Sequence, residues 1–431
     1  MRSAIMGITA ALVAGYSLPA RAQAAVPAAA PAAAQAMPPM ADKAEPPSPA
    51  APLPAKCPTG QQLDPAMAMC MAAPAKPKPV ATIRINQFLA YSATSGPRGQ
   101  ERVTGPGAWM LMGEKDLSSR TSLHVSVMGS LEQLTVGSIG TPQLLQTENL
   151  DAMHAHDTLM AVEFRDTIKL GTSNSQDLTI LFAPRGGAAF GPVPYMHRDS
   201  AEGNPDAPLG HNMQDGFHDV STVLGVAYRV RRTTIEATAF SGHDLSWPLP
   251  LHRPDSFAFR LSHGIDDHVT LGGSYADVLT PDDAGGAEHE KFIAAWLATN
   301  HQIQNLRLRT SLVWGQARAA ASGSQNSFLT EAVLQRDANN LFARAELLQV
   351  TPEQLSLVQA GDSGDPRWVG AVTLGYERAL LKRGPFSLFA GSSLTKDFVP
   401  SAFDGEYGRR PGGVKFFLRM KVGGSTGMSA M

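Results

Sequence analysis

Apolar and polar residues alternate along most of the chain from Val80 onward, in segments separated by Gly, Asp, Asn and Pro. The stretch 305–316 reads NLRLRTSLVWGQ, in which leucine and tryptophan side chains fall on one face and arginine side chains fall on the other. A period of two is typical of β-strands, because successive side chains point to opposite faces. No helical period interrupts the pattern, so residues 80–431 are expected to form an all-β structure with one apolar and one polar face.

Sixteen such segments can be drawn. They are expected at 80–92, 107–115, 121–131, 157–167, 176–183, 219–229, 233–241, 256–264, 268–278, 289–299, 305–316, 326–336, 341–350, 367–379, 385–394 and 411–422. The connections after even-numbered segments are mostly short, with 167–175 as the exception, and the others are longer. This alternation is typical of a transmembrane antiparallel up-and-down β-barrel, in which an even strand number leaves both chain ends on one side. Fourteen strands is the alternative count, because 132–183 does not divide clearly.

A soluble all-β secreted protein would also show alternating strands. However, the segments are longer than the roughly five or six residues that are usual in soluble sheets. Their length suits a tilted crossing of a bilayer, so we expect the transmembrane barrel.

The N-terminal residues have the layout of an export signal. One arginine precedes an apolar stretch that is too short to span a bilayer as a helix, and Ala22-Gln23-Ala24 follows as a cleavage site. Residues 1–24 are therefore expected to be a signal peptide. Residues 25–79 are rich in Ala and Pro and are expected to form a disordered periplasmic tether, followed by the barrel of residues 80–431.

Both cysteines, Cys57 and Cys70, lie in this tether. In an exported chain, two nearby cysteines are expected to form a disulfide. The alternative is a Cu(I) site in which Cys70 acts with the thioethers of Met67, Met69 and Met71.

The polar faces of the expected strands carry many charged side chains, which indicates a hydrated lumen rather than a packed core. The residues expected to line or constrict this lumen are Arg260, Arg307, Arg309, Arg344, Glu346, Glu377 and Arg419. With Arg84, Glu163, Arg165 and Lys415 they make eight basic and three acidic side chains, which favours a weak preference for anions. The connection 184–218 is rich in proline, glycine and polar residues, so we expect it to fold toward the lumen and narrow it.

Histidines gather in the long connections beside carboxylates, a combination that suits Zn or Cu(II). The candidate metal ligands are His154, His156, Asp157, His197, His211, Asp215 and His218. Their spacing matches no named zinc motif. The alternative is that these polar residues anchor the long connection through hydrogen bonds.

Several stretches are distinctive: SGPRG at 95–99, the segments 140–160, 194–228 and 237–244, the sequence YGRRPGGVKFFLRMK near the end, and the CPTG…MCM element. They resemble a family of uncharacterised, predicted outer-membrane β-barrel proteins of Gram-negative bacteria. Members often occur near copper or other heavy-metal resistance genes, so the resemblance implies an outer-membrane location and a link to metal. Where members often have two adjacent histidines, this chain has His211-Asn212, which weakens a site that needs the pair.

Two other classes of function are not expected. Ser200 and Ser221 lie near His197 and His218 in the sequence, but no nucleophile-elbow pattern is present, so we do not expect an enzyme. Charged residues make up only 17% of the chain and the net charge is −2, which excludes the basic footprint of a nucleic-acid-binding protein.

The sequence therefore predicts a porin-like channel of the outer membrane for small solutes or ions, with no resident cofactor. Its expected partners are outer-membrane lipid, the solutes or metal ions themselves, and the barrel-assembly machinery during biogenesis. The alternative is an outer-membrane protein that binds copper or another heavy metal, with Cu or Zn on the histidines, and that is involved in metal resistance.

Overall fold

The computed structural model describes residues 80–136, 158–171, 175–242, 251–281, 287–319, 323–355, 357 and 364–423, together with the backbone of 61–64 and 69–72. The chain divides into two units, Met1–Ala75 and Lys76–Met431. In the first unit, β1 (Gln61–Asp64) and β2 (Met69–Ala72) form an antiparallel pair.

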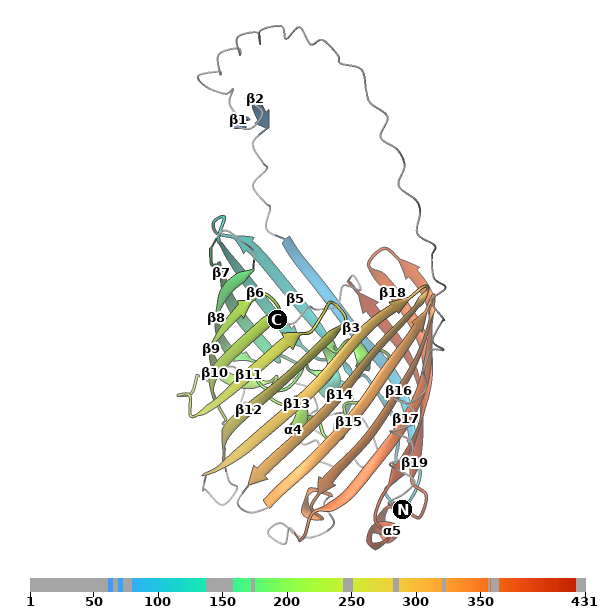
Figure 1. Cartoon of the computed structure of the whole chain (residues 1–431). Coiled ribbons are helices and arrows are strands. Elements are labelled where there is room, and N and C mark those ends of the chain that lie inside the picture. The colour runs from blue at the N-terminus through green and yellow to red at the C-terminus, as the bar shows by residue number, and fades with distance from the viewer. Residues whose placement is uncertain are drawn as a thin grey trace, which may run out of the picture. The chain divides into compact units, whose positions relative to one another are not determined.

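The second unit is built almost entirely of strands (Figure 1). They are β3 (Val80–Thr94), β4 (Glu101–Thr104), β5 (Gly107–Asp116), β6 (Thr121–Gly129), β7 (Ala161–Lys169), β8 (Gln176–Gly186), β9 (Val220–Val230), β10 (Thr233–Ser241), β11 (Ser256–Gly264), β12 (Val269–Pro281), β13 (Ala287–Ile303), β14 (Leu306–Ala319), β15 (Gly323–Arg336), β16 (Asn339–Val350), β17 (Arg367–Arg383), β18 (Phe386–Phe398) and β19 (Gly412–Val422). The helices are single turns or little more: α2 (Glu132–Val136), η2 (Tyr195–His197), η3 (Asp199–Ala201), α4 (His211–Gln214), η4 (Glu353–Leu355), η5 (Ser401–Phe403) and α5 (Asp404–Tyr407).

These strands form a closed antiparallel barrel, because β19 pairs with β3 over Val422↔Ile85 to Gly413↔Thr94. β4 and β5 pair with successive parts of β3, so they are two segments of one strand. The seventeen segments therefore make sixteen strands in the part of the chain that the structure describes, which confirms the predicted fold class. Among the described residues, no helix is long and apolar enough to cross a membrane.

Each of the sixteen predicted ranges overlaps one strand of the barrel, and the differences lie at the ends. The segment β4 was missed because Gly105-Pro106 interrupts its alternation, and Pro106 lacks an amide hydrogen for the ladder. Short and long connections alternate as expected. Four of the short ones have only two residues, which are 231–232, 304–305, 337–338 and 384–385.

The two faces of the wall follow the predicted alternation. Phe259, Leu374 and Phe416 on the outer face have exposed fractions of 51%, 58% and 56%, whereas the inward-facing Glu377 and Arg419 are fully buried. Large apolar side chains therefore cover the outside, and charged side chains lie inside the barrel.

Aromatic rings cover glycines on the inner face of the wall. The ring of Phe342 in β16 lies over Gly375 in β17, and a Cβ atom at Gly375 would be 2.0 Å from the Cζ atom of that ring. Phe342 is buried and packs with Phe88 and Phe417 in one apolar cluster. The absence of a side chain at Gly375 is therefore a packing requirement of this part of the wall.

We expect the substitution Gly375→Ala to lower the stability of the folded barrel by about 1–3 kcal/mol, because the Phe342 ring must leave its site. Thermal unfolding in detergent micelles measures this change. Gly113→Ala in β5 is the matched control, since a Cβ there has no neighbouring atom within 4 Å. Equal melting temperatures for the two variants would contradict the packing argument.

Candidate functional site

The segment between β8 and β9 lies inside the barrel. Its residues are almost continuously buried, and its backbone contacts the inner faces of strands that are distant in the sequence. The amide of Ala189 donates to Thr238 in β10 (2.9 Å), and the amide of Gly191 donates to Ser274 in β12 (2.8 Å). Figure 1 shows the same segment, with α4, within the ring of strands.

The two arms of this segment enter the lumen side by side. Gly191 has a φ of 69°, and a Cβ atom there would be 2.1 Å from the carbonyl oxygen of Gln214 in the returning arm. Only glycine permits such a conformation and approach. Arg185 and Gly186 still pair with β9, so the part that leaves the wall is 187–219, slightly shorter than the predicted 184–218. We refer to it as the inward segment.

Arg198 makes the first charged anchor of the inward segment. Its guanidinium donates to Glu331 of β15 (2.5 Å) and to Asp215 of the returning arm (2.7 Å). Although burial disfavours the charged form, these two carboxylates outweigh it and raise the pKa of Arg198. Glu331 also accepts a hydrogen bond from Ser200 (2.8 Å) and lies 3.2 Å from Arg344. One buried wall carboxylate therefore holds two residues of the inward segment.

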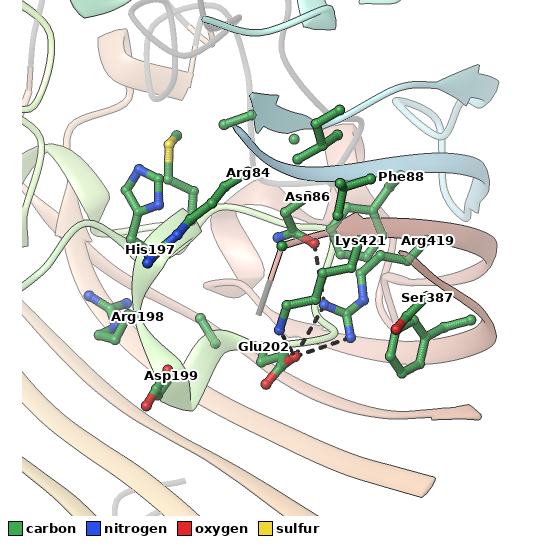
Figure 2. Close-up of a pocket in the computed structure, with 18 of the residues that line it drawn as sticks. Arg84, Asn86, Phe88, His197, Arg198, Asp199, Glu202, Ser387, Arg419 and Lys421 are labelled. Atoms are coloured by element: carbon green, nitrogen blue, oxygen red, sulfur yellow. Dashed lines mark hydrogen bonds and ion pairs between the residues drawn. The ribbon is translucent and has the colours of Figure 1, made fainter. Parts of the chain in front are cut away.

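Glu202 makes the second anchor and lies among three basic side chains of the wall, two of which, Arg419 and Lys421, are labelled in Figure 2. Arg309 forms an ion pair with it, Lys421 donates to it at 2.6 Å, and Arg419 lies at 3.4 Å. Burial alone would raise the pKa of Glu202, but the charges of Arg419, Lys421 and Arg309 hold it well below its ordinary value. The carboxylate is thus ionised and shared by β14 and β19.

A third anchor follows at Asp206 and Leu209. Asp206 pairs with Lys415 of β19, and its backbone carbonyl accepts a hydrogen bond from Arg344 (2.6 Å). The amide of Leu209 donates to Glu346 of β16 (2.5 Å). The inward segment is therefore fixed to strands β14, β15, β16 and β19 by charged contacts.

Two apolar clusters also hold the inward segment. Where its two arms leave the wall, the rings of Phe190 and Phe217 pack against Phe240 and Phe292 of the wall, with the Phe217 and Phe292 centroids 4.8 Å apart. Near α4, Leu209 and Met213 pack in a second cluster of buried residues, the others being Leu348, Val350, Leu355, Val369, Ala371, Phe403 and Tyr407. These apolar contacts fill parts of the lumen that the charged anchors do not occupy.

Among the described residues, cavities remain between the inward segment and the wall. Cavity 1 (about 420 Å³) lies along β3, β5 and β19, cavity 2 (about 440 Å³) along β10 to β14, and cavity 3 (about 110 Å³) along β5 to β7. His197 lines all three. Arg198, Asp199 and Arg307 lie between cavities 1 and 2, with 3.6 Å between the Arg307 guanidinium and the Asp199 carboxylate.

The structure places all seven predicted lumen residues on the inner face of the wall. Arg309, Arg344, Glu346 and Arg419 contact the inward segment directly. The other three are Arg260, which pairs with Glu236, Arg307, which lies near Asp199, and Glu377, which pairs with Arg419.

Sequence reasoning missed Arg198, Glu202, Asp206, Glu331 and Lys421 as parts of this network. Period-two alternation could have placed Glu331 and Lys421 inside, because each occupies an inward position of its strand. Nothing local marks the three residues of the inward segment, because their partners in the wall lie more than a hundred positions away.

The predicted metal ligands are only partly brought together. The imidazole of His211 contacts the Asp215 carboxylate, and His218 Nδ1 lies 3.1 Å from the Asp215 carbonyl oxygen. The rings of His211 and His218 are 4.9 Å apart, and His197 lies elsewhere, against Met128. Within the described ranges, no group of three or more His, Cys, Asp or Glu residues could hold a metal ion. His154, His156 and Asp157 lie outside those ranges.

The remaining predicted residues can be placed only in part. The hydroxyl of Ser200 donates to Glu331 and lies 2.7 Å from the hydroxyl of Ser311, and Ser221 is buried at the start of β9. Cys57 lies outside the described residues, and Cys70 is in β2, of which only the backbone is described. The disulfide stays a prediction.

Replacing Glu202 by Gln is expected to destabilise the barrel by roughly 3 kcal/mol, because it removes the counter-charge of the buried Arg309 and one of the two carboxylates beside Arg419. Because the pKa of Glu202 is lowered in the folded barrel, the stabilisation by this carboxylate depends on pH. The stabilisation is present above pH 4.5, which is the ordinary pKa of the free side chain. It is lost as the pH falls through the lower pKa of the folded state. Thermal unfolding of both proteins from pH 7 downward measures this.

Asp199→Asn is the control, since Asp199 is half-exposed and makes a single long ion pair. The difference in melting temperature between Glu202→Gln and the unaltered protein should shrink as the pH falls. A difference that is constant with pH, or as large for Asp199→Asn, would contradict the assignment.

The fold is similar to those of solved outer-membrane proteins. An anion-selective porin from Comamonas acidovorans has a TM-score of 0.53 at 12% identity over 80% of this chain and 100% of that chain. OmpF of Salmonella typhi in complex with daunomycin has 0.52 at 7% identity over 79% and 97%. The outer membrane channel DcaP of Acinetobacter baumannii has 0.50 at 9% identity over 80% and 97%. No protein-family model and no curated protein matches the sequence. The barrel therefore shares its fold with these bacterial outer-membrane proteins.

Proposed function

We propose that this protein is a porin-like channel of the outer membrane that passes small solutes or ions, with a preference for anions. The observation that carries the proposal is a basic, water-accessible cavity beside an inward segment that is fixed across the lumen of a closed barrel. The proteins of similar fold include an anion-selective porin and an outer membrane channel, which supports this proposal.

The outer surface of the wall suits contact with lipid. Exposed Leu, Phe and Ile side chains recur on the outward positions of most strands, and the largest exposed fractions include 66% for Leu394 and 58% for Leu374. In water such a surface would drive aggregation, whereas in a bilayer it matches the hydrocarbon. The expected signal peptide (1–24), periplasmic tether (25–79) and assembly by the barrel-assembly machinery agree with this location.

The charge of cavity 1 favours anions. Its lining includes seven basic and two acidic side chains, which are Arg84, Arg198, Arg307, Arg309, Lys382, Arg419 and Lys421 against Asp199 and Glu202. Cavity 2 is balanced, with Arg198, Arg260 and Arg307 against Asp199, Glu236 and Asp267. A concave surface with an excess of one charge attracts counter-ions from solution. Cavity 1 would therefore concentrate small anions at the inward segment.

The inward segment would set the aperture. Cavities 1 and 2 adjoin at Arg198, Asp199 and Arg307, where the wall and the segment approach each other. Four of the predicted lumen residues, Arg309, Arg344, Glu346 and Arg419, would hold the segment in place, and Glu377 would support Arg419. Arg260 and Arg307 would line the cavities.

We expect the purified barrel to conduct in planar bilayers and to prefer anions, and Arg84→Glu to lower the anion-to-cation permeability ratio by a factor on the order of tenfold. Arg84 points into cavity 1 without belonging to the anchoring contacts described above (Figure 2). Arg120→Glu, a charge reversal at an exposed turn between β5 and β6, is the control and should leave the ratio unchanged. Cation preference of the unaltered barrel would refute the proposed anion preference, and no conductance at all would refute the channel proposal.

Excision of the inward segment tests its role as the constriction. Because Gly191 lies against Gln214, residues 192–213 can be replaced by a short Gly-Ser linker without spanning a long distance. We expect higher single-channel conductance and weaker ion preference. A correctly folded barrel with unchanged conductance would show that another element sets the aperture.

A further inference from the structure

Five methionine side chains gather at one place inside the barrel. Met110 of β5, Met128 of β6 and Met160 just before β7 are buried in one cluster, and Met112 and Met196 pack against it. Met110 and Met128 are direct partners across the β5–β6 ladder, and the amide of Met160 donates to the carbonyl of Met128 (2.7 Å). Residues that face each other in this way have side chains within contact distance.

The inward segment adds an imidazole to this cluster. His197 ends η2, and its Nε2 atom lies 3.1 Å from the Sδ atom of Met128. Met196, the preceding residue, faces the same cluster. An imidazole nitrogen and a thioether sulfur atom are therefore held within hydrogen-bond distance by two elements that are far apart in the sequence.

The cluster borders water-accessible space on two sides. Met110 and His197 line both cavity 1 and cavity 3, Met196 lines cavity 1, and Met128 lines cavity 3. If these side chains served only to fill an apolar core, leucine would fill a similar volume and would adopt better-defined rotamers. What methionine adds at this position is a flexible, polarisable thioether beside the route that solutes would take.

Thioether sulfur and neutral imidazole nitrogen are ligands for soft cations. They select Cu(I), and by the same chemistry Ag(I), over Mg²⁺ or Ca²⁺, which require oxygen donors. Two carboxylates line cavity 3, and both are paired: Glu163 with Arg165 at 2.9 Å and Asp215 with Arg198 at 2.7 Å. The local chemistry therefore favours a soft monovalent cation.

We propose that Met110, Met128 and His197 form a binding site for a soft monovalent cation, Cu(I) or Ag(I), with Met112, Met160 and Met196 as further thioether donors. The three rotatable bonds of each methionine let the sulfur atoms turn toward the ion without movement of the wall. This site is distinct from the carboxylate–histidine ligands that the sequence suggested, apart from His197, and it does not depend on conduction through the barrel.

Silver titration of the full chain, folded in detergent micelles and in chloride-free buffer, tests the site without redox chemistry. We expect saturable Ag⁺ binding by calorimetry and shifts of the methionine methyl resonances in NMR spectra. The double substitution Met110→Leu/Met128→Leu should weaken this binding at least about tenfold. The cysteines and methionines of residues 57–71 are unchanged in every variant, so the difference between variants reports on the barrel site alone.

Met213→Leu is the matched control, because Met213 is a buried methionine of the same inward segment but belongs to the other cluster. If the double variant does not fold, His197→Gln replaces it, since this change keeps all five methionines. Equal Ag⁺ affinity in the unaltered chain and the folded cluster variant would overturn the proposal. So would an equal loss of affinity in Met213→Leu.

Discussion

Closure of the sheet is the constraint on which the rest of the structure depends. Pairing of β19 with β3 gives every strand two neighbours, so no strand edge is left to seek a partner, and the backbone polar groups of the wall are satisfied within it. A closed wall of sixteen strands encloses more space than its own side chains can fill. The inner face must therefore be covered by water or by another part of the chain.

The inward segment 187–219 provides that cover, and its charge is matched to the wall. Inward-facing arginines and lysines would repel one another if they stood alone, and Glu202 and Asp206 bring negative charge to them. In return, Glu331 and Glu346 of the wall accept hydrogen bonds from Arg198 and Leu209. Buried ion pairs contribute little net stability, because desolvation opposes the attraction, but a missing partner is costly. The network therefore specifies where the segment lies more than it adds to the stability of the barrel.

The strands could be predicted from the sequence because their signal is local. A strand is defined by alternation within about ten residues and by a turn at each end. All sixteen strands could therefore be predicted, and the errors were the missed segment β4 and the positions at which strands end. The faces followed from the same alternation, which put Arg309 and Arg419 inside. The partners of these arginines did not follow, because Glu202 meets them only after the inward segment has crossed the lumen. The methionine cluster was hidden for the same reason, since Met196 meets Met110 and Met128 only after the inward segment has entered the lumen.

The lumen contains a basic region and a region rich in methionine, and His197 lies between them. It lines all three cavities, with the basic cavity 1 on one side and the thioethers of Met110 and Met128 on another. An anion drawn to the arginines and a soft cation drawn to the sulfur atoms would thus approach the same residue along different parts of the wall. Movement of His197 would alter both environments, because its position is set by the segment that Arg198 and Glu202 anchor. The ion pairs that fix the inward segment therefore also fix the geometry between the two proposed binding regions.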